Sequence, residues 1–326
     1  MKKAKILSGI IAAAVSFVLL SIVQLKVATP MLLAERFYSG FGWLQIGVMS
    51  VLGGFLAVKM LDVSKVSKWR TISWTLFSFV FFAQLILGLS GFDDFLMTGK
   101  LHLPIPAVIP GGAIFRMEFS FMPILFLSTV FLTGPAWCSQ LCYFGALDNL
   151  TSGIKSKSRK FNTKHLKLIK SISLVIFVFL VILLRAFGVS LYSAAIIAIV
   201  FGVIGLLVVI FVSTFTGKMI HCVYFCPLGT ILNYARFVNP FRMYIDDTCT
   251  SCMRCAKSCK YLALEKQNIA ARKPGFTCIM CGDCLNSCHE GSIKYKLWKF
   301  SPETARIIYI VITVSVFIVF LNVARI

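Results

Sequence analysis

Eight of the twelve cysteines stand in two runs of identical spacing. The runs are Cys249-x2-Cys252-x2-Cys255-x3-Cys259 and Cys278-x2-Cys281-x2-Cys284-x3-Cys288. Thiolates spaced in this way bind [4Fe-4S] clusters, and in paired runs the fourth cysteine reaches over to the other cluster. We therefore predict that the first cysteine set, which binds one cluster, is Cys249, Cys252, Cys255 and Cys288. The second cysteine set, which binds the other cluster, is then Cys278, Cys281, Cys284 and Cys259.

Zinc is the main alternative to iron, because C-x2-C pairs also bind zinc ions as tetrathiolates. One structural zinc ion needs only two such pairs, whereas this segment offers two complete four-membered runs. The count therefore favours iron-sulfur clusters. In one respect the runs depart from the usual motif, since Lys260 and His289 replace the proline that commonly follows the fourth cysteine. We expect altered packing or reduction potential from this change, and unchanged ligation.

The other four cysteines form two C-x3-C pairs, which are Cys138/Cys142 and Cys222/Cys226. Each pair lies in one copy of an internal repeat, at residues 134–149 and 217–233. Residues four apart share a face of a helix, so we expect each pair to present two sulfurs together. If the repeat brings the pairs together, they could bind a further metal or cluster or act as redox-active dithiols. Ordinary buried cysteines are the alternative.

Together these features resemble the membrane polyferredoxins of the NapH and NosR type, to which the CcoG-type copper reductases are related. The resemblance covers roughly residues 137–292 and rests on transmembrane helices, two C-x3-C motifs and a double-cluster ferredoxin segment. The second motif matches the C-x3-C-P pattern of that family, with Pro227 after Cys226, whereas the first has Tyr143 in place of proline. The resemblance implies electron transfer between membrane quinol and a partner redox protein, with the C-x3-C cysteines on the route.

The chain that positions these cysteines has the composition of a membrane protein, because 58% of its 326 residues are hydrophobic and only 14% are charged. A helix needs about 20 apolar residues to cross a bilayer. Stretches of that kind lie at residues 6–26, 41–60, 71–91, 117–137, 169–188, 191–215 and 305–323. We therefore predict a mainly α, polytopic membrane protein of six or seven transmembrane helices with a small α+β dicluster ferredoxin-like domain.

The net charge of +21 comes from basic residues whose positions indicate how the chain is oriented in the membrane. Basic residues gather between the apolar stretches, and seven of them lie between Lys155 and Lys170 without an acidic residue. Such segments stay on the cytoplasmic side. The sequence therefore predicts a multi-pass protein of a prokaryotic cytoplasmic membrane, with the ferredoxin domain on the cytoplasmic side and no nucleic-acid partner.

Four regions follow from these patterns. We predict an N-terminal transmembrane anchor at 1–30, a helical membrane domain with the two C-x3-C repeats at 31–240, the dicluster domain at 241–298 and a C-terminal transmembrane helix at 299–326. A cleaved signal peptide is the alternative for the first region. Its apolar run is longer than the usual signal-peptide core, which favours an uncleaved anchor.

Other cofactors are disfavoured by the sequence. None of the four histidines, which are His102, His165, His221 and His289, lies well inside an apolar stretch, so we expect no bis-histidine haem. No glycine-rich dinucleotide fingerprint stands between a strand and a helix, so we expect neither NAD nor FAD. Quinol is the natural electron donor in a membrane. The expected partners are the lipid bilayer, the quinol pool and other redox subunits.

The function that these patterns favour is electron transfer through two [4Fe-4S] clusters, between the quinol pool or a membrane redox partner and a partner redox protein. No residue is assigned a catalytic role. We expect an electron-transfer subunit of an oxidoreductase complex, such as a component of a quinol dehydrogenase. One alternative is a maturation or assembly reductase of the CcoG type, which would reduce a metal or a thiol. Another is a scaffolding subunit in which the clusters are only structural.

Overall fold

The computed structural model describes residues 2–27, 29–95, 103, 105–118, 121–154, 161 and 163–323. Four of the basic residues expected on the cytoplasmic side, Lys155, Lys157, Arg159 and Lys160, lie outside these residues, as does His102. Within them, six helices are long and apolar enough to cross a membrane. These are α1 (Lys2–Lys26), α3 (Gly42–Met60), α4 (Val66–Leu89), α9 (Leu166–Ala186), α10 (Leu191–Leu207) with its continuation through η3 (Val208–Ser213) and α11 (Thr214–Thr216), and α16 (Pro302–Val323). The prediction of a polytopic helical protein is confirmed.

The expected span at 117–137 is wrong. The described residues between α4 and α9 contain short helices instead, chiefly α5 (Val108–Arg116) and α6 (Phe121–Thr133). α6 ends at Gly134, which has a left-handed φ of +57° and is followed by a proline. The amide of Asn239 packs so closely on Gly134 that a Cβ there would lie 2.8 Å from Asn239 Cγ. A hydropathy profile averages over apolar residues and does not detect that the helix ends at Gly134.

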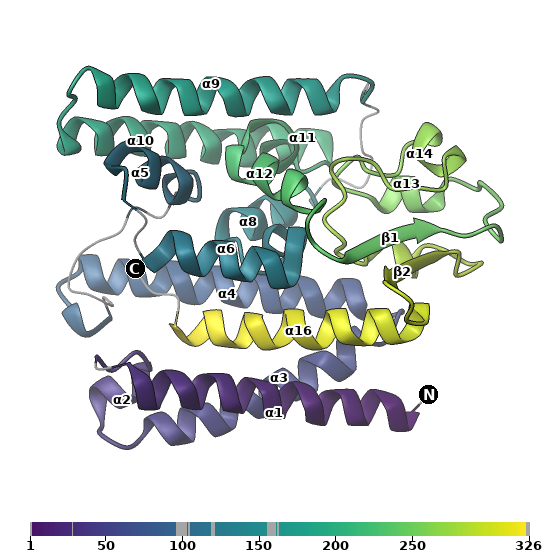
Figure 1. Ribbon diagram of the computed structural model, residues 1–326, viewed down its shortest axis with the longest axis horizontal. Coiled ribbons are helices and arrows are strands. Elements are labelled where there is room, and N and C mark those ends of the chain that lie inside the picture. Colours follow the sequence, from purple (N-terminus) through teal and green to yellow (C-terminus); the bar gives the residue numbers. More distant parts are fainter. Residues whose placement is uncertain are drawn as a thin grey trace.

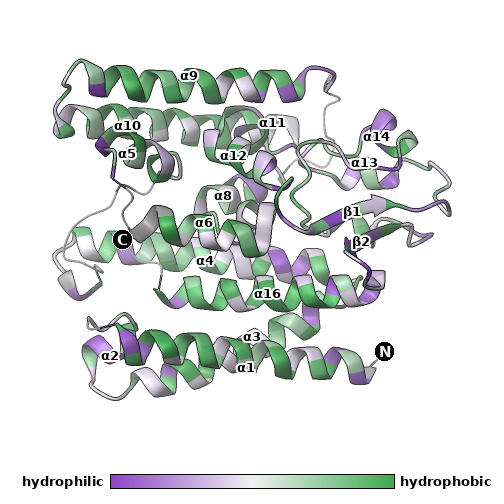
Figure 2. Cartoon of the chain, in the orientation of Figure 1, coloured by the Kyte–Doolittle hydropathy of each residue, from purple (hydrophilic) through white to green (hydrophobic). Residues whose placement is uncertain are grey.

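The long helices run side by side, with α1 and α3 on one side of the bundle, α9 and α10 on the other, and α4 and α16 between them together with the shorter α6 (Figure 1). Most of their residues are hydrophobic (Figure 2). α1 packs tightly on α3, because a Cβ on Gly9 would lie only 3.0 Å from the carbonyl oxygen of Gly54. Close approach at small residues is typical of membrane helix pairs. α1 therefore belongs to the packed bundle.

Both cysteine runs lie between two short strands, β1 (Phe241–Ile245) and β2 (Ile293–Leu297). The strands are antiparallel, with Phe241 opposite Leu297 and Ile245 opposite Ile293. The intervening segment carries α13 (Arg254–Ser258), α14 (Lys266–Ala270) and α15 (Asp283–Asn286). It lies beyond one end of the helix bundle, the end at which the N-terminus is also found (Figure 1).

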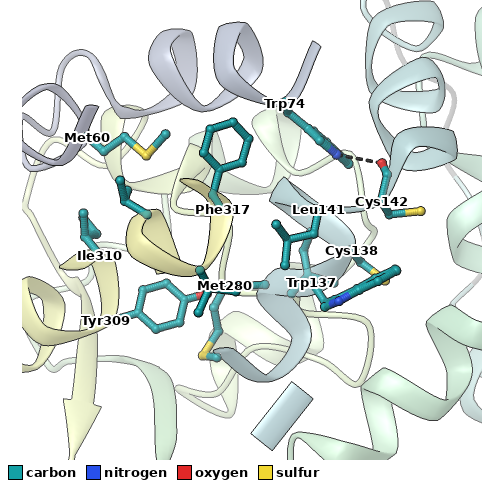
Figure 3. Close-up of a cluster of buried hydrophobic side chains, with 14 of the residues drawn as sticks. Met60, Trp74, Trp137, Cys138, Leu141, Cys142, Met280, Tyr309, Ile310 and Phe317 are labelled. Carbon is teal, nitrogen blue, oxygen red and sulfur yellow. Dashed lines mark hydrogen bonds between the residues drawn. The ribbon is translucent and has the colours of Figure 1, made fainter. Parts of the chain in front are cut away.

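The start of α16 follows directly from β2. Ser301 accepts a hydrogen bond of 3.2 Å on its Oγ from the backbone N–H of Thr304, which caps the helix as the Ser-Pro-Glu sequence indicates. α16 is the most deeply buried of the long helices. Its Tyr309 and Phe317 lie in one apolar cluster with Trp137 and Met280 (Figure 3). Because Met280 comes from the second cysteine run, this cluster fixes that run against the membrane helices.

The remaining short elements connect these parts. They are α2 (Leu33–Phe37), η1 (Asp93–Phe95), η2 (Gly134–Ala136), α7 (Trp137–Gln140), α8 (Tyr143–Thr151), η4 (His221–Phe225) and α12 (Pro227–Ala235). The last four carry or flank the C-x3-C pairs.

Candidate metal centre

The first cysteine set lines one cavity of about 390 Å³. Its four members are joined in the lining by residues of the same segment, among them Arg254, His289 and Glu290. Burial raises the pKa of Cys255 to about 11, and the nearby thiols of Cys288 and Cys249 act in the same direction. Cys252 is exposed, so the cavity lies at the surface of the protein.

The second cysteine set lines another, much narrower cavity of about 20 Å³. Burial raises the pKa of Cys284 well above its ordinary value, with Cys281, Cys278 and Cys259 contributing in that order. The pKa of Cys278 is raised to about 11, again first by burial. Each cavity thus combines three cysteines of one run with the last cysteine of the other run.

Both runs repeat the same backbone conformation around their second cysteine. The residue before it is left-handed in each run, with φ of 56° at Ser251 and 55° at Met280. The residue after it is also left-handed, with φ of 62° at Met253 and 83° at Gly282. Residues other than glycine adopt this conformation at a cost of roughly 1–2 kcal/mol, and such strain concentrates at ligand-binding segments. The loops around the second cysteine of each run therefore have the same backbone shape.

Zinc ions and cubane clusters place different demands on the four thiols of a cysteine set. Among the described residues, no three His, Cys, Asp or Glu side chains converge as the ligands of one metal ion do. A zinc ion draws its thiolates to about 2.3 Å from one point, whereas a cubane cluster binds each cysteine at a different iron atom. Each cysteine set offers four thiols around one cavity, which is the donor set that one [4Fe-4S] cluster needs.

The four C-x3-C cysteines lie together in the interior, and we call them the four-cysteine site. Its members are Cys138, Cys142, Cys222 and Cys226. Burial raises the pKa of Cys222 well above its ordinary value, and Asp148 and the other three thiols of the site raise it further. Burial likewise raises the pKa of Cys138, with Cys142 and Cys226 adding to the effect. The internal repeat thus brings cysteines more than 80 residues apart into electrostatic contact.

The expectation that each C-x3-C pair shares one helical face is wrong, because the chain turns between the two cysteines. Cys138 belongs to α7 and Cys222 to the π-helical turn η4, whereas Cys142 and Cys226 are the N-cap residues of α8 and α12. The two N-caps have nearly equal backbone angles, with φ, ψ of −89°, 113° at Cys142 and −76°, 116° at Cys226. The repeat in the sequence is therefore a repeat in structure.

Helix N-termini point their free N–H groups at two of these sulfurs. The N–H of Gly145 donates to Cys142 Sγ at 3.4 Å. The N–H groups of Gly229 and Leu228 lower the pKa of Cys226 against the larger effect of burial, which raises it. For Cys142 burial is also the stronger effect, so its pKa rises to about 12. Free N–H groups at a helix N-terminus stabilise negative charge.

Tyr143 departs from the proline of the second motif without altering the turn. It occupies the first position of α8, as Pro227 does in α12, and proline and other residues are both accepted there. Its ring stacks on Phe81 of α4, with centroids 4.0 Å apart and planes 9° from parallel. The tyrosine thus adds a contact to a membrane helix that proline could not make.

Three buried charged residues at these sites were not singled out from the sequence. Arg70 is bound to Asp283 by hydrogen bonds of 2.9 and 2.6 Å. Lys170 donates from Nζ to the carbonyl oxygen of Cys222 at 3.1 Å. Asp148 accepts from the N–H of Cys222 at 3.0 Å, and burial raises its pKa to about 6. Lys170 is one of the seven basic residues that were assigned from the sequence to a cytoplasmic segment. The available signal for Arg70 and Lys170 was a position beside or within an apolar stretch, because a charge there costs free energy.

Comparison with known proteins finds a similarity to iron-sulfur proteins in the C-x3-C segments. A family model described as a 4Fe-4S binding domain matches residues 116–162 and 198–242, one C-x3-C pair in each part. These two parts of the chain are similar to that 4Fe-4S binding domain. The matched residues cover less than half of the chain and end before the two cysteine runs.

Three relatives are similar to the chain over longer stretches. An uncharacterized protein of Methanocaldococcus jannaschii is 26% identical over 181 residues, covering 53% of this chain and 68% of the relative. A second uncharacterized protein of that organism is 24% identical over 249 residues, covering 72% and 97%. YccM of Escherichia coli, named as a candidate electron transport protein, is 23% identical over 229 residues, covering 64% and 60%. No solved structure matches the chain.

These findings support a membrane protein of iron-sulfur electron transfer. None of the three relatives is named as a NapH, NosR or CcoG protein, so that narrower resemblance stays a prediction.

Proposed function

We propose that this protein passes electrons between the quinol pool, or a membrane redox partner, and a partner redox protein on the cytoplasmic side. The observation that carries the proposal is the sorting of eight cysteines into two cavities, each with three cysteines of one run and one of the other. In the proposal each cavity binds one [4Fe-4S] cluster, as in NapH-type and NosR-type polyferredoxins. A bound cluster would supply reversible one-electron chemistry.

The electron count agrees with a quinol donor. Oxidation of one quinol to quinone releases two electrons and two protons, and two one-electron centres can hold both electrons while the protons leave to water. The protein holds the receiving cysteines at one end of the bundle, where the second set packs on the membrane helices. Because a hydrocarbon core is about 30 Å thick, an acceptor at that same end is the simplest partner.

A maturation reductase of the CcoG type ranks second. It would bind the metal ion that it reduces at accessible thiols, and the four-cysteine site is the natural place. Three of its thiols are buried and Cys222 is only partly exposed. Burial of this kind suits a fixed internal site better than the capture and release of a metal ion, so we place electron transfer first.

The proposal is tested with anaerobically purified protein in detergent, mixed with a menaquinol analogue and monitored by EPR. Wild-type protein should develop the signals of reduced [4Fe-4S] clusters on addition of the quinol, and the same signals with dithionite. A comparison variant is Cys222→Ser, which changes the four-cysteine site and leaves both cysteine sets intact, so it should show the same signals as wild type with dithionite. Wild-type clusters that are reduced by dithionite and not by the quinol would contradict the quinol donor and favour a protein donor.

A further inference from the structure

The two cysteine sets differ in what surrounds them. Every residue that lines either cavity belongs to the ferredoxin segment, at 245–293 for the first set and 243–284 for the second. The loops of the second set are also bound to elements of the membrane domain. Lys218 Nζ donates to the carbonyl oxygen of Cys259 at 2.5 Å, and the Tyr261 hydroxyl donates to the carbonyl oxygen of Cys138 at 3.5 Å. The second set is therefore the one that is joined to the membrane domain.

Arg70 is the centre of this junction. It lies near the start of α4, and only 1% of its side chain is exposed. Its Nε and Nη2 grip the carboxylate of Asp283 in a bidentate pair, and its Nη1 donates to the carbonyl oxygen of Ser139 at 3.1 Å. Asp283 follows Cys281 by two residues, and Ser139 follows Cys138 directly. One guanidinium thus touches the loop of the second cysteine set and the loop of the four-cysteine site.

The two charges of this pair act on Cys281 in opposite directions. Asp283 follows Cys281 by two residues and Arg70 is bound to its carboxylate, so a negative and a positive charge both lie near this cysteine. Asp283 is close because it sits in the cysteine loop, and negative charge at that distance disfavours an added electron. A buried cation favours it, and in the low dielectric of the interior neither charge is screened well by salt. The positive charge of Arg70 therefore offsets the unfavourable effect of the Asp283 carboxylate on adding an electron.

We propose that Arg70 is a positioning residue for the second cysteine set, and that its charge raises the reduction potential of the centre bound there while leaving the first set unaffected. Arg70 donates hydrogen bonds to Asp283 and Ser139, and it acts through Asp283 and through the charge that it brings from a membrane helix into the loop. The inference rests on the proposed function, because it needs a redox centre at the second set. It adds that the second set faces the membrane domain and the first set faces the solvent.

The test is an EPR-monitored redox titration of the full-length protein in detergent, on five variants beside the wild type. Arg70→Gln removes the cation, Asp283→Asn removes the carboxylate, and the double variant removes both, so that no buried charge is left unpaired. Arg70→Lys keeps the charge and serves as the conservative rescue. Arg306→Gln is the matched control, since this half-buried arginine of α16 donates to the carbonyl oxygen of Met60.

A soluble dysprosium chelate identifies the two centres in these spectra. The chelate speeds the relaxation of the centre nearest to solvent, which is the first set because Cys252 is exposed. In Arg70→Gln, the equilibrium constant for reducing the other, protected centre should fall about tenfold, which is about 59 mV for one electron. Asp283→Asn should shift the potential upward by a similar amount, and the double variant should return it toward the wild-type value. Arg70→Lys and Arg306→Gln should stay at the wild-type value.

The inference is overturned if the chelate-sensitive centre shifts instead, if both centres shift together, or if neither shifts in protein that retains its iron. A shift that is the same in Arg70→Lys as in Arg70→Gln would also overturn it, since a lost shape and not a lost charge would then be responsible. Wild-type protein that binds no iron would instead overturn the proposed function.

Discussion

Lys170 Nζ lies 3.1 Å from the carbonyl oxygen of Cys222, to which it donates a hydrogen bond. The lysine comes from α9 and is almost fully buried, with 1% of its side chain exposed. It is therefore a basic group held inside the protein near the thiols of Cys226, Cys138 and Cys222. A site with such a neighbour is suited to negative charge, either on thiolates or on a metal–thiolate group.

Lys170→Met should slow the quinol-driven reduction of the protein about tenfold, which corresponds to about 1.4 kcal/mol. The physical reason is that the four-cysteine site loses its internal cation. Stopped-flow absorbance with a menaquinol analogue measures the rate. Lys167→Met is the control on the same helix, since Lys167 is exposed. Equal rates for Lys170→Met and wild type would show that the cation has no part in electron entry.

Cys288→Ser should perturb the solvent-facing centre, although Cys288 belongs to the same run as the cysteines of the other centre. The reason is that Cys288 lines the cavity of the first set. Cys284→Ser, four residues earlier, should perturb the protected centre. EPR spectra with and without the dysprosium chelate separate the two cases. If both variants change the same signal, each run binds its own cluster and the exchange of fourth ligands is wrong.

Gly145→Ala should destabilise the protein by about 1–3 kcal/mol, because a Cβ at this position meets atoms on two sides. It would lie 2.5 Å from Trp74 Cζ2 and 2.9 Å from the carbonyl oxygen of Cys138. Thermal unfolding in detergent measures the change. Gly47→Ala is the control, because its Cβ would meet nothing within 4 Å, and it should stabilise α3 by about 0.5–1 kcal/mol. A harmless Gly145→Ala would show that the turn after Cys142 is loosely packed.

Asp148→Asn should be more stable than wild type at neutral pH, by up to about 3 kcal/mol. Burial raises the pKa of Asp148 from 3.8 to about 6, so the native state holds the proton more tightly than the unfolded state does. The stability that this proton gives is complete below pH 3.8 and is lost as the pH rises through 6. The advantage of the variant should therefore shrink to roughly half between pH 7.5 and pH 5.

Melting temperatures of wild type and Asp148→Asn at these two pH values measure that advantage. Asp247→Asn, at an exposed aspartate, is the control and should match wild type at each pH. An advantage of Asp148→Asn that does not change with pH would mean that the carboxyl group is not held protonated by burial.

The long helices could be predicted from sequence because a bilayer demands about 20 consecutive apolar residues and few other segments have them. The same rule failed at residues 117–137. There the helix ends at Gly134, and the reason lies more than 100 residues away, in the amide of Asn239, which donates to the carbonyl oxygen of Phe131. A hydropathy average over about 20 neighbouring residues cannot include a contact between residues that are so far apart in the sequence.

The cysteine sets were predictable for a different reason, because the spacing of the ligands is a local property of the sequence. The partners of the charged residues beside these cysteines were not predictable. Arg70 and Asp283 are 213 residues apart, and Lys170 and Cys222 are 52 apart. In the sequence Arg70, Asp283 and Lys170 have the form of ordinary loop or surface charges. Only the fold shows which partner each one has.

Iron and acid-labile sulfide per chain decide whether the two cysteine sets bind two clusters. Anaerobically purified wild-type protein should contain about eight iron and about eight sulfide per chain, because each [4Fe-4S] cluster brings four of each. A count clearly above eight would place further iron at the four-cysteine site. Zinc in place of iron, or about four iron in total with both cysteine sets intact, would contradict the central claim.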